Sequence, residues 1–510
     1  MNTSFLTTTL FLKKGLIALA ISIISLSTIP CMAQSKSAKR GIGWDEKTQK
    51  LSDAPIDKML PGISWLYNWG PTPSGSAANL GTDDGMAFVP MCWNGNFNET
   101  SIRNYIKDHK STKYLLGFNE PNFSAQANMT PKAAAAKWQA LEQIAEDYGI
   151  KLVAPALNFT GEKVGGKMWQ PYDWLDEFIK EYKSQYGKLP KMDCLALHCY
   201  MNWYGASTWF TTEYFYKDLY DSKNENYGKY PNIVELLDAY KEANGHFPKM
   251  MLTEFCSWEG DKDGFVTTKE NQIDQMTQKV QKMEQSDLVE GYAWFMANGK
   301  ASEKPYYSLF DTNTASSELS DLGKVYVNMS SFDTEKYYAP NEPIQAKDYI
   351  DASTDNQQAK LRPNTESGSD MPLQVEMQRN TQTKYLIDVP SEGEYKFTLH
   401  IKSSAKTKVI LYLDGKNIAT NELESTNNVW DDRTFEVTLH EGKHDIALSN
   451  SSASFLINSF SFASTSSSID NVKAEQDDSK AKIYNLAGRR ASKNQKEILI
   501  INGRKVINFK

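Results

Sequence analysis

The chain has 510 residues, of which 40% are hydrophobic and 12% aromatic, so it is long enough to bury a large core and to form more than one domain. This composition excludes a fibrous protein and a disordered tail. The formal net charge is -7 at pH 7, and an acidic chain is not expected to bind nucleic acid.

The N-terminal segment has the pattern of an export signal. Lys13 and Lys14 precede an apolar stretch over residues 16–29. We therefore expect a signal peptide over residues 1–33, cut after Ala33, and a secreted or cell-surface protein. The stretch is too short to favour a transmembrane anchor, and no other apolar run in the sequence approaches the length needed to cross a bilayer.

The next part of the chain repeats a short apolar strand that usually leads into a helix. Strands are predicted at residues 40–45, 62–70, 86–95, 113–121, 151–159, 193–203, 250–258 and 291–299, and helices near residues 100–109, 131–148, 172–186, 233–244 and 267–286. Thr130 is expected to cap the second helix and Gly149 to end it. Eight strands alternating with helices predict an α/β fold, a (β/α)8 TIM barrel, over residues 34–335. Such barrels carry their chemistry at the C-terminal ends of the strands.

Glutamates stand at the ends of two predicted strands. Glu120 ends the fourth strand, in YLLGFNEPN, and Glu254 lies near the end of the seventh, in MLTEFCSW. Each has the alternative of a buried structural carboxylate in an ion pair. Two glutamates at one rim of a barrel favour chemistry instead.

A pair of carboxylates is the arrangement that cleaves a glycosidic bond. One carboxylate attacks the anomeric carbon, and the other protonates the leaving oxygen and then deprotonates water; retaining enzymes hold the two about 5–5.5 Å apart. The fourth and seventh strands face each other across a barrel mouth, so the long side chains of Glu120 and Glu254 can meet at that separation. The sequence therefore predicts a retaining glycoside hydrolase.

Aromatic and polar side chains gather at the same strand ends. Five tryptophans lie at or just beyond them, namely Trp69, Trp93, Trp203, Trp258 and Trp294, with Trp69 and Trp294 as the best candidates for sugar contacts. Aromatic faces stack on pyranose rings, so five such residues favour a glycan cleft, although core packing is the alternative for each one. Asn119, beside Glu120, can hydrogen-bond a sugar hydroxyl.

His198 and Tyr200 lie near the end of the sixth strand, next to the strand that carries Glu254. Their spacing of two places both side chains on one face. Either side chain can hydrogen-bond Glu254 and keep it ionised, while a purely structural role is the alternative for His198. No second histidine or cysteine stands at ligand spacing, so we expect no metal and no cofactor.

These motifs resemble clan A of the glycoside hydrolases, through GFNEPN in the fourth strand and LTEF in the seventh. SWLYNWG in the second strand and FVPMCW in the third make the chain most similar to glycoside hydrolase family 128, whose members act on β-1,3-glucans. The resemblance covers roughly residues 40–330. It implies a β-glucan such as laminarin as the substrate, and we expect endo attack.

The resemblance also implies roles for individual residues. Glu120 is then the acid/base and Glu254 the nucleophile, while Asn119 binds the sugar 2-hydroxyl and His198 and Tyr200 line the site. Two alternatives stay open. The first is another clan A activity, such as a mannanase or xylanase, and the second is a surface glycan-binding protein without catalysis, against which the presence of both glutamates counts.

The region after the predicted barrel changes to alternating strands broken by DG and EG turns. These predict an all-β sandwich over residues 340–464. The patterns IQAKDY, DVPSEGEYKFTL, LYLDG and EGKHDIAL resemble carbohydrate-binding module family 6, which implies a sugar site with Trp430 as the stacking candidate. Gln345 and Lys347 stand where that family has glutamates, so a bound calcium is not expected. A sandwich that only buttresses the barrel is the alternative.

The C-terminal end of the chain has two further parts. Residues 465–480 are polar and are predicted to form a linker. Residues 481–510 read as short strands around AG and NG turns, and we expect a small β domain. That segment resembles the C-terminal sorting domains of type IX secretion, which implies this secretion machinery as a partner and the cell surface or medium as the location. A basic surface-binding arm is the alternative.

Overall fold

The computed structural model describes residues 34–76, 79–82, 85–158, 162–202, 212–257, 268–300, 306–353 and 359–465, together with three short strands between residues 483 and 507. The predicted signal peptide, most of the predicted linker, Trp203 and Trp258 therefore lie outside the described residues. Within the part of the chain that is described, none of the helices is both long and apolar enough to cross a membrane.

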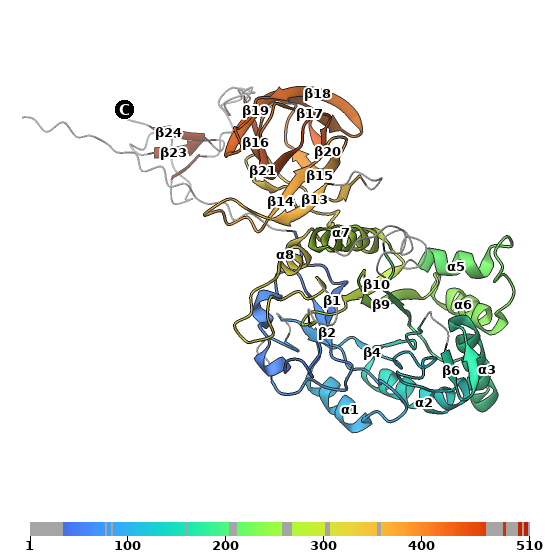
Figure 1. The fold of residues 1–510 in the computed structure, drawn as a ribbon. Coiled ribbons are helices and arrows are strands. Elements are labelled where there is room, and N and C mark those ends of the chain that lie inside the picture. The colour runs from blue at the N-terminus through green and yellow to red at the C-terminus, as the bar shows by residue number, and fades with distance from the viewer. Residues whose placement is uncertain are drawn as a thin grey trace, which may run out of the picture.

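The first region contains an eight-stranded parallel sheet with the strand order β3-β2-β1-β10-β9-β8-β5-β4 (Figure 1). The strands are β1 (Arg40–Gly43), β2 (Trp65–Tyr67), β3 (Ala87–Phe88), β4 (Tyr114–Leu116), β5 (Lys151–Val153), β8 (Cys194–Cys199), β9 (Lys249–Phe255) and β10 (Val289–Trp294). Just beyond β3, Met91 forms a parallel bridge with Leu116 of β4. The two edges of the sheet therefore meet, and the sheet curls in a (β/α)8-like arrangement.

Helices cover the outside of this curled sheet (Figure 1). They are α1 (Glu99–Asp108), α2 (Pro131–Tyr148), α3 (Pro171–Tyr186), α5 (Thr212–Tyr220), α6 (Pro231–Asn244), α7 (Lys269–Gln285) and α8 (Asp321–Asn328). Two short 3-10 helices connect β1 to β2, and a hairpin of β6 (Glu162–Val164) and β7 (Lys167–Trp169) precedes α3. The predicted ends of α2 are confirmed, because the Thr130 side chain accepts a hydrogen bond from the Ala133 amide and Gly149 has a φ of 64°.

Side chains of the sheet alternate between two apolar layers. The inner cluster contains Trp65, Tyr67, Val89, Met91, Leu116, Val153, Cys194, Met251 and Ala293. Their chain neighbours Leu66, Leu115 and Leu252 belong to the outer core that packs against the helices. This alternation, with a period of two residues, decides which side chains can reach the mouth of the curled sheet.

Two antiparallel sheets follow, at the top of Figure 1. One has the order β13-β14-β21-β16-β19, with β11 also paired to β21, and the other has the order β12-β15-β20-β17-β18. The strands are β11 (Ile344–Gln345), β12 (Asp351–Ala352), β13 (Lys360–Pro363), β14 (Leu373–Met377), β15 (Gln382–Val389), β16 (Gly393–Lys402), β17 (Thr407–Leu413), β18 (Lys416–Leu423), β19 (Trp430–Leu439), β20 (Gly442–Asn450) and β21 (Phe455–Ser464). The strands β22 (Ile483–Asn485), β23 (Ile498–Ile501) and β24 (Arg504–Ile507) form a separate sheet.

The β-sheet region packs against α7, and polar contacts connect the two. Asp274 of α7 accepts a hydrogen bond from Arg362 Nη1 at 2.7 Å and lies 3.3 Å from Lys360 Nζ. Gln281 of the same helix donates to Asp351 Oδ1 at 2.8 Å. The side chains of Asp274 and Arg362 are only 17% and 18% exposed. The second region is therefore attached to the first through partly buried charges.

Candidate active site

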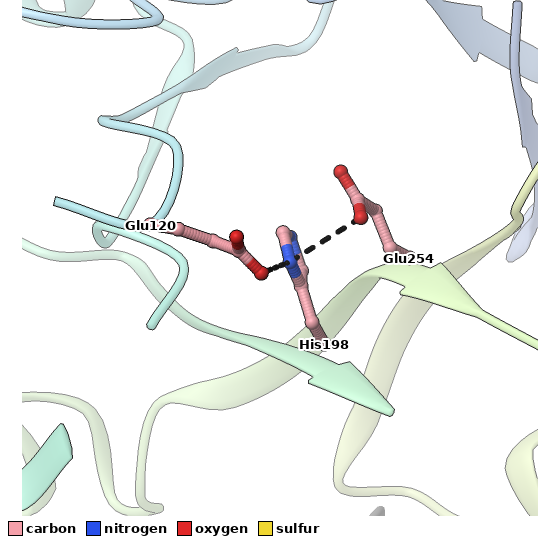
Figure 2. A group of neighbouring side chains, drawn as sticks. All are labelled: Glu120, His198 and Glu254. Carbon is pink, nitrogen blue, oxygen red and sulfur yellow. Dashed lines mark hydrogen bonds and ion pairs between the residues drawn. The ribbon is translucent and has the colours of Figure 1, made fainter. Parts of the chain in front are cut away.

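Glu120 and Glu254 lie at the same mouth of the curled sheet, on either side of His198 (Figure 2). Glu120 follows β4, His198 belongs to β8 and Glu254 to β9. One oxygen of each carboxylate and one nitrogen of the imidazole all lie within 4.8 Å of one another. All three side chains are buried. The structure thus brings together two glutamates that are far apart in the sequence.

The backbone places these residues through irregular pairing at the strand ends. The register of β8 against β9 shifts after Leu197, and this shift sets His198 opposite Glu254. Glu120 has a φ of 45°, and its amide donates to the Ala156 carbonyl at 2.7 Å. A left-handed conformation in a non-glycine residue costs of the order of 1–3 kcal/mol and is held in place by the surrounding structure.

Trp69 has the same kind of backbone, with a φ of 59°. The turn around it is braced by Asn68, whose Oδ1 accepts the Gly70 amide at 2.9 Å. The Asn68 Nδ2 in turn donates to Glu46 Oε2 at 2.6 Å. These contacts direct the Trp69 indole towards the carboxylate pair.

His198 holds both carboxylates through a single ring nitrogen. Its Nδ1 lies 2.9 Å from Glu120 Oε1 and 3.4 Å from Glu254 Oε2, so Nδ1 carries the proton that it donates. Its Nε2 lies 3.0 Å from Thr253 Oγ1. Burial lowers the pKa of His198, but the negative charges of Glu254 and Glu120 outweigh burial and raise that pKa above its ordinary value of 6.5.

Glu254 accepts hydrogen bonds on both of its oxygens. Trp69 Nε1 donates to Oε1 at 2.7 Å, and the Tyr200 hydroxyl donates to Oε2. Burial raises the pKa of Glu254 above its ordinary value of 4.5 although His198, Tyr200 and Trp69 each lower it. These donors favour the ionised form of Glu254 and so act against burial, which favours the protonated form.

An open cavity of about 770 Å³ lies over the pair. Its aromatic lining consists of Trp69, Trp93, Phe123, Tyr200 and Phe295. Asn119 also lines it, and within the described ranges the buried Asn119 Oδ1 has no hydrogen-bond partner. An unpaired buried acceptor is costly, so this oxygen is suited to a ligand hydroxyl. Predicted site residues Trp69, Trp93, Asn119 and Tyr200 all reach this cavity.

Trp294 does not reach the cavity, and its prediction as a sugar-stacking residue is wrong. Its side chain is 0% exposed, its Nε1 donates to the Tyr307 carbonyl at 2.7 Å, and its ring packs edge-on against Phe255. Ala293 faces the inside of the sheet, so Trp294 faces the helices. The next residue, Phe295, lines the cavity in its place.

Sequence reasoning also missed Tyr67 and Thr253. Tyr67 lies in the inner cluster, and its hydroxyl donates to the Thr253 carbonyl at 2.8 Å and lies 3.4 Å from Glu254 Oε1. Tyr67 stands two residues before Trp69, so strict alternation along the second strand would have placed both side chains on one face. No comparable pattern in the sequence pointed to Thr253.

The group Glu120, His198 and Glu254 is also the cluster of described residues whose donor atoms lie close enough together to hold a metal ion. The 2.9 Å separation of His198 Nδ1 from Glu120 Oε1 is that of a hydrogen bond. These two atoms are therefore joined by a proton in a hydrogen bond. The expectation of a site without metal or cofactor stays a prediction.

Trp430 lies away from this cavity, in β19 of the second region. Its ring stacks on His400 with a centroid separation of 5.6 Å. His400 is hydrogen-bonded to Asp432 at 2.7 Å and to Glu366 at 2.9 Å. One face of the indole is thus occupied by the protein itself.

The chain is similar to solved structures of glycoside hydrolase family 128. A solved endo-β-1,3-glucanase of glycoside hydrolase family 128, subgroup II, from Pseudomonas viridiflava is 33% identical; the match covers 58% of this chain and 98% of that one, with a TM-score of 0.43. A subgroup II endo-β-1,3-glucanase from Sorangium cellulosum is 25% identical, with 57% and 98% coverage and a TM-score of 0.40.

A curated relative is alkali-sensitive linkage protein 1 of Schizosaccharomyces pombe, which is 26% identical over 303 residues. The match covers 58% of this chain and 45% of that protein, so the chain spans less than half the length of this relative. The family model for the glycosyl hydrolase catalytic core matches residues 41–326, which is more than half of the chain and includes both glutamates. The chain therefore belongs to the glycosyl hydrolase catalytic core family and is a glycoside hydrolase.

Proposed function

We propose that this glycoside hydrolase cleaves β-1,3-glucan with retention of anomeric configuration and by endo attack. The observation that carries the reaction type is the carboxylate pair, with oxygens within 4.8 Å of each other beneath a large cavity. This separation fits a retaining enzyme, whereas inverting enzymes hold their carboxylates about 6.5–9.5 Å apart. The 33% identity to the Pseudomonas viridiflava endo-β-1,3-glucanase over 98% of that chain supports the substrate and the mode of attack.

The donors around the pair support Glu254 as the nucleophile and Glu120 as the acid/base. The two carboxylates differ in the hydrogen-bond donors that reach them, and such donors favour the ionised form. Protonating Glu254 would oppose the donors on its two oxygens, which come from Trp69 and Tyr200. The described surroundings of Glu120 offer it one side-chain donor, His198. The larger set of donors therefore supports Glu254 as the carboxylate that attacks, which leaves Glu120 as the acid/base.

The reaction then proceeds in two steps. In the first, a Glu254 oxygen bonds to the anomeric carbon while the glycosidic bond breaks and the Glu120 proton moves to the leaving oxygen. In the second, Glu120 takes a proton from water, whose oxygen displaces Glu254 and restores the free carboxylate. Asn119 Oδ1 accepts a hydrogen bond from a sugar hydroxyl, and Trp69 and Trp93 offer apolar faces to the sugar rings.

The charge of the cavity favours an uncharged glycan. Four carboxylates line it against a single lysine among the described lining residues: Asp45, Glu46, Glu120 and Glu254 against Lys47. The net negative charge of the cavity would repel a polymer of uronic acids, whereas it would not repel a neutral glucan. Charge alone leaves mannan and xylan open, so these must be compared directly.

Reducing-end release from laminarin, mannan and xylan tests the substrate. We expect turnover on laminarin that exceeds turnover on the other two, and its loss by several orders of magnitude in Glu254→Gln. Glu120→Ala should retain formation of the glycosyl-enzyme on substrates with good leaving groups, because their departure needs little protonation. Preference for mannan or xylan would replace the β-1,3-glucanase proposal with another activity of the same chemistry.

Product stereochemistry tests the mechanism. Two inversions give net retention, so proton NMR early in hydrolysis should show the β-anomer of the new reducing end first, with the α-anomer growing in by mutarotation. Initial appearance of the α-anomer would show an inverting enzyme and would remove the nucleophile role from Glu254.

We further propose that the β-sheet region is an accessory domain with a sugar site near Trp430. Sequence resemblance supports this, together with the aromatic stack of Trp430 on His400. The Lys347 ammonium pairs with the buried Asp348 carboxylate, which fits the expected absence of calcium. Binding to insoluble β-1,3-glucan should weaken in Trp430→Ala and stay unchanged in the neighbouring Val429→Ala; equal binding by both variants would leave a structural role only.

Export is a separate proposal, based on the N-terminal and C-terminal sequence patterns. We propose that residues 1–33 are removed, that residues 34–335 and 340–464 form the catalytic and accessory domains, and that residues 481–510 direct type IX secretion. Fractionation of cells that express the full chain, beside a chain cut at residue 480, tests this. Equal amounts of both proteins at the cell surface and in the medium would refute the sorting role.

A further inference from the structure

We infer that Thr253 is a positioning residue for the reaction: its hydroxyl holds the His198 ring so that the Nδ1–H is directed at Glu120, with Glu254 close by. This inference rests on the proposed glycosidase function. It assigns a task to a residue that carries no charge and that does not line the cavity. Thr253 therefore acts on the substrate only through its neighbour.

The geometry gives each imidazole nitrogen a separate task. Nδ1 donates to Glu120 Oε1 at 2.9 Å and lies 3.4 Å from Glu254 Oε2, which is an ion-pair contact. Nε2 lies 3.0 Å from Thr253 Oγ1, and this is the partner that the described residues offer it. Thr253 and His198 are only 2% and 6% exposed, so bulk water cannot readily replace that hydroxyl.

A hydroxyl suits this position because it both donates and accepts. Glu120 alternates between carboxylic acid and carboxylate during the reaction, and the charge of His198 responds to that change. When the imidazole is neutral, the Thr253 hydroxyl donates to the Nε2 lone pair; when the imidazole is protonated, the hydroxyl rotates and accepts from Nε2–H. The ring therefore keeps Nδ1–H on Glu120 in both states.

The strand holds Thr253 firmly enough for this task. It lies in β9 directly before Glu254, and its carbonyl accepts a hydrogen bond from the Tyr67 hydroxyl at 2.8 Å. The titratable side chains that face His198 or its carboxylate partners are Glu120, Glu254, Tyr200 and Tyr67. Thr253 provides the neutral contact on the opposite side of the ring from the glutamates.

Valine at this position keeps the shape and removes the hydroxyl. We expect Thr253→Val to lower kcat on laminarin about ten- to hundredfold, because a buried Nε2 loses its partner, with little change in KM. The basic limb of the pH profile of kcat/KM should move to lower pH. Removing the acceptor for Nε2–H disfavours the protonated ring, so His198 should lose its positive charge at a lower pH. Thr253→Ser should restore both quantities.

A matched control is Thr112→Val. Thr112 is 2% exposed, and its hydroxyl donates to the Phe88 carbonyl at 3.0 Å, a backbone contact that does not involve the carboxylate pair. The control should lose some thermal stability and keep the wild-type pH profile. A pH profile that shifts equally in Thr112→Val and Thr253→Val would overturn the inference, because the shift would then report only a disturbed core.

A double-mutant cycle with His198→Gln keeps the inference testable even where Thr253→Val is poorly stable. Thr253 acts only through His198, so adding Thr253→Val to His198→Gln should cause no further loss of kcat per folded enzyme. A further tenfold loss would overturn the inference. Activity that survives in Glu254→Gln would instead refute the proposed function. Inactive Glu254→Gln beside fully active Thr253→Val would refute the positioning role alone.

Discussion

Burial of Glu254 makes the stability of the enzyme depend on pH. Its pKa in the folded chain is raised above the ordinary value of 4.5, so the folded state binds this proton more tightly than the unfolded state. The resulting stability is fully present below about pH 4.5 and is lost as the pH rises through the raised value. His198 adds to this trend, because the negative charges of Glu254 and Glu120 outweigh burial and raise its pKa above 6.5.

We therefore predict that Glu254→Gln gains stability relative to the wild type as the pH rises. The measurement is thermal unfolding of both proteins from about pH 4 to about pH 8. Glu290→Gln is a control of opposite sign: burial opposes the shift, but Lys151 and Tyr114 lower the pKa of Glu290, so its contribution is lost as the pH falls. A constant difference between Glu254→Gln and the wild type across this range would contradict the prediction.

The sequence allowed the two glutamates to be predicted because both stand at the ends of strands in one predicted barrel; either one alone has a structural alternative. Trp294 was wrongly predicted to face the cavity. Successive side chains of a strand face opposite sides of the sheet, and the position of the strand end does not show which of them face inwards. Thr253 was out of reach, because a threonine inside a strand is an ordinary β-former until its hydroxyl is seen against an imidazole.

At the scale of the element, the segment from β4 to Glu120 depends on the small size of Gly117. A Cβ at this position would lie 2.7 Å from the Val153 carbonyl oxygen and 2.9 Å from the Trp138 ring. Neither neighbour can withdraw, because one is backbone of the adjacent strand and the other is a fully buried side chain. The strand end that carries Glu120 would have to move instead.

Gly117→Ala should therefore destabilise the fold by about 1–3 kcal/mol and lower kcat, because small displacements of a catalytic group are costly. Thermal unfolding and turnover on laminarin check both effects. Gly393→Ala, where a Cβ meets no atom within 4 Å, is the control. Equal behaviour of the two variants would show that the strand end tolerates the methyl group.

Strand and helix positions were largely predictable, because apolar periodicity and caps such as Thr130 and Gly149 are local signals. The register shift after Leu197, which sets His198 opposite Glu254, was not predictable. Such a shift depends on how two strands meet in space, and neither strand marks it in its own sequence.

At the scale of the whole molecule, the contacts of Asp274 make the stability of the first region depend on the second. Asp274→Ala leaves Arg362 and Lys360, which are partly buried, without this carboxylate. We expect a loss of about 1–3 kcal/mol and faster proteolysis between the regions. The measurements are thermal unfolding and limited proteolysis.

The control is Lys406→Ala, which removes pairs to Glu422 and Glu424 whose side chains are at least half exposed. Exposed pairs contribute little to stability, so this variant should behave like the wild type. Equal losses in both variants would mean that the junction contributes nothing beyond ordinary surface charge. The packing of the second region against α7 could not be predicted from the sequence, because Asp274 looks like any other solvent-exposed charge on a helix.

The left-handed backbone at Glu120 and Trp69 has a consequence for how this enzyme can be improved. Glycine adopts such angles without a steric cost, so Glu120→Gly relaxes the turn that Glu120→Ala leaves strained. At Glu120, the residue that best relieves the backbone strain is thus one that cannot perform the proposed reaction. Directed evolution that selects for survival of heating alone would drift towards robust, inactive proteins, and a selection on sugar release must accompany every round.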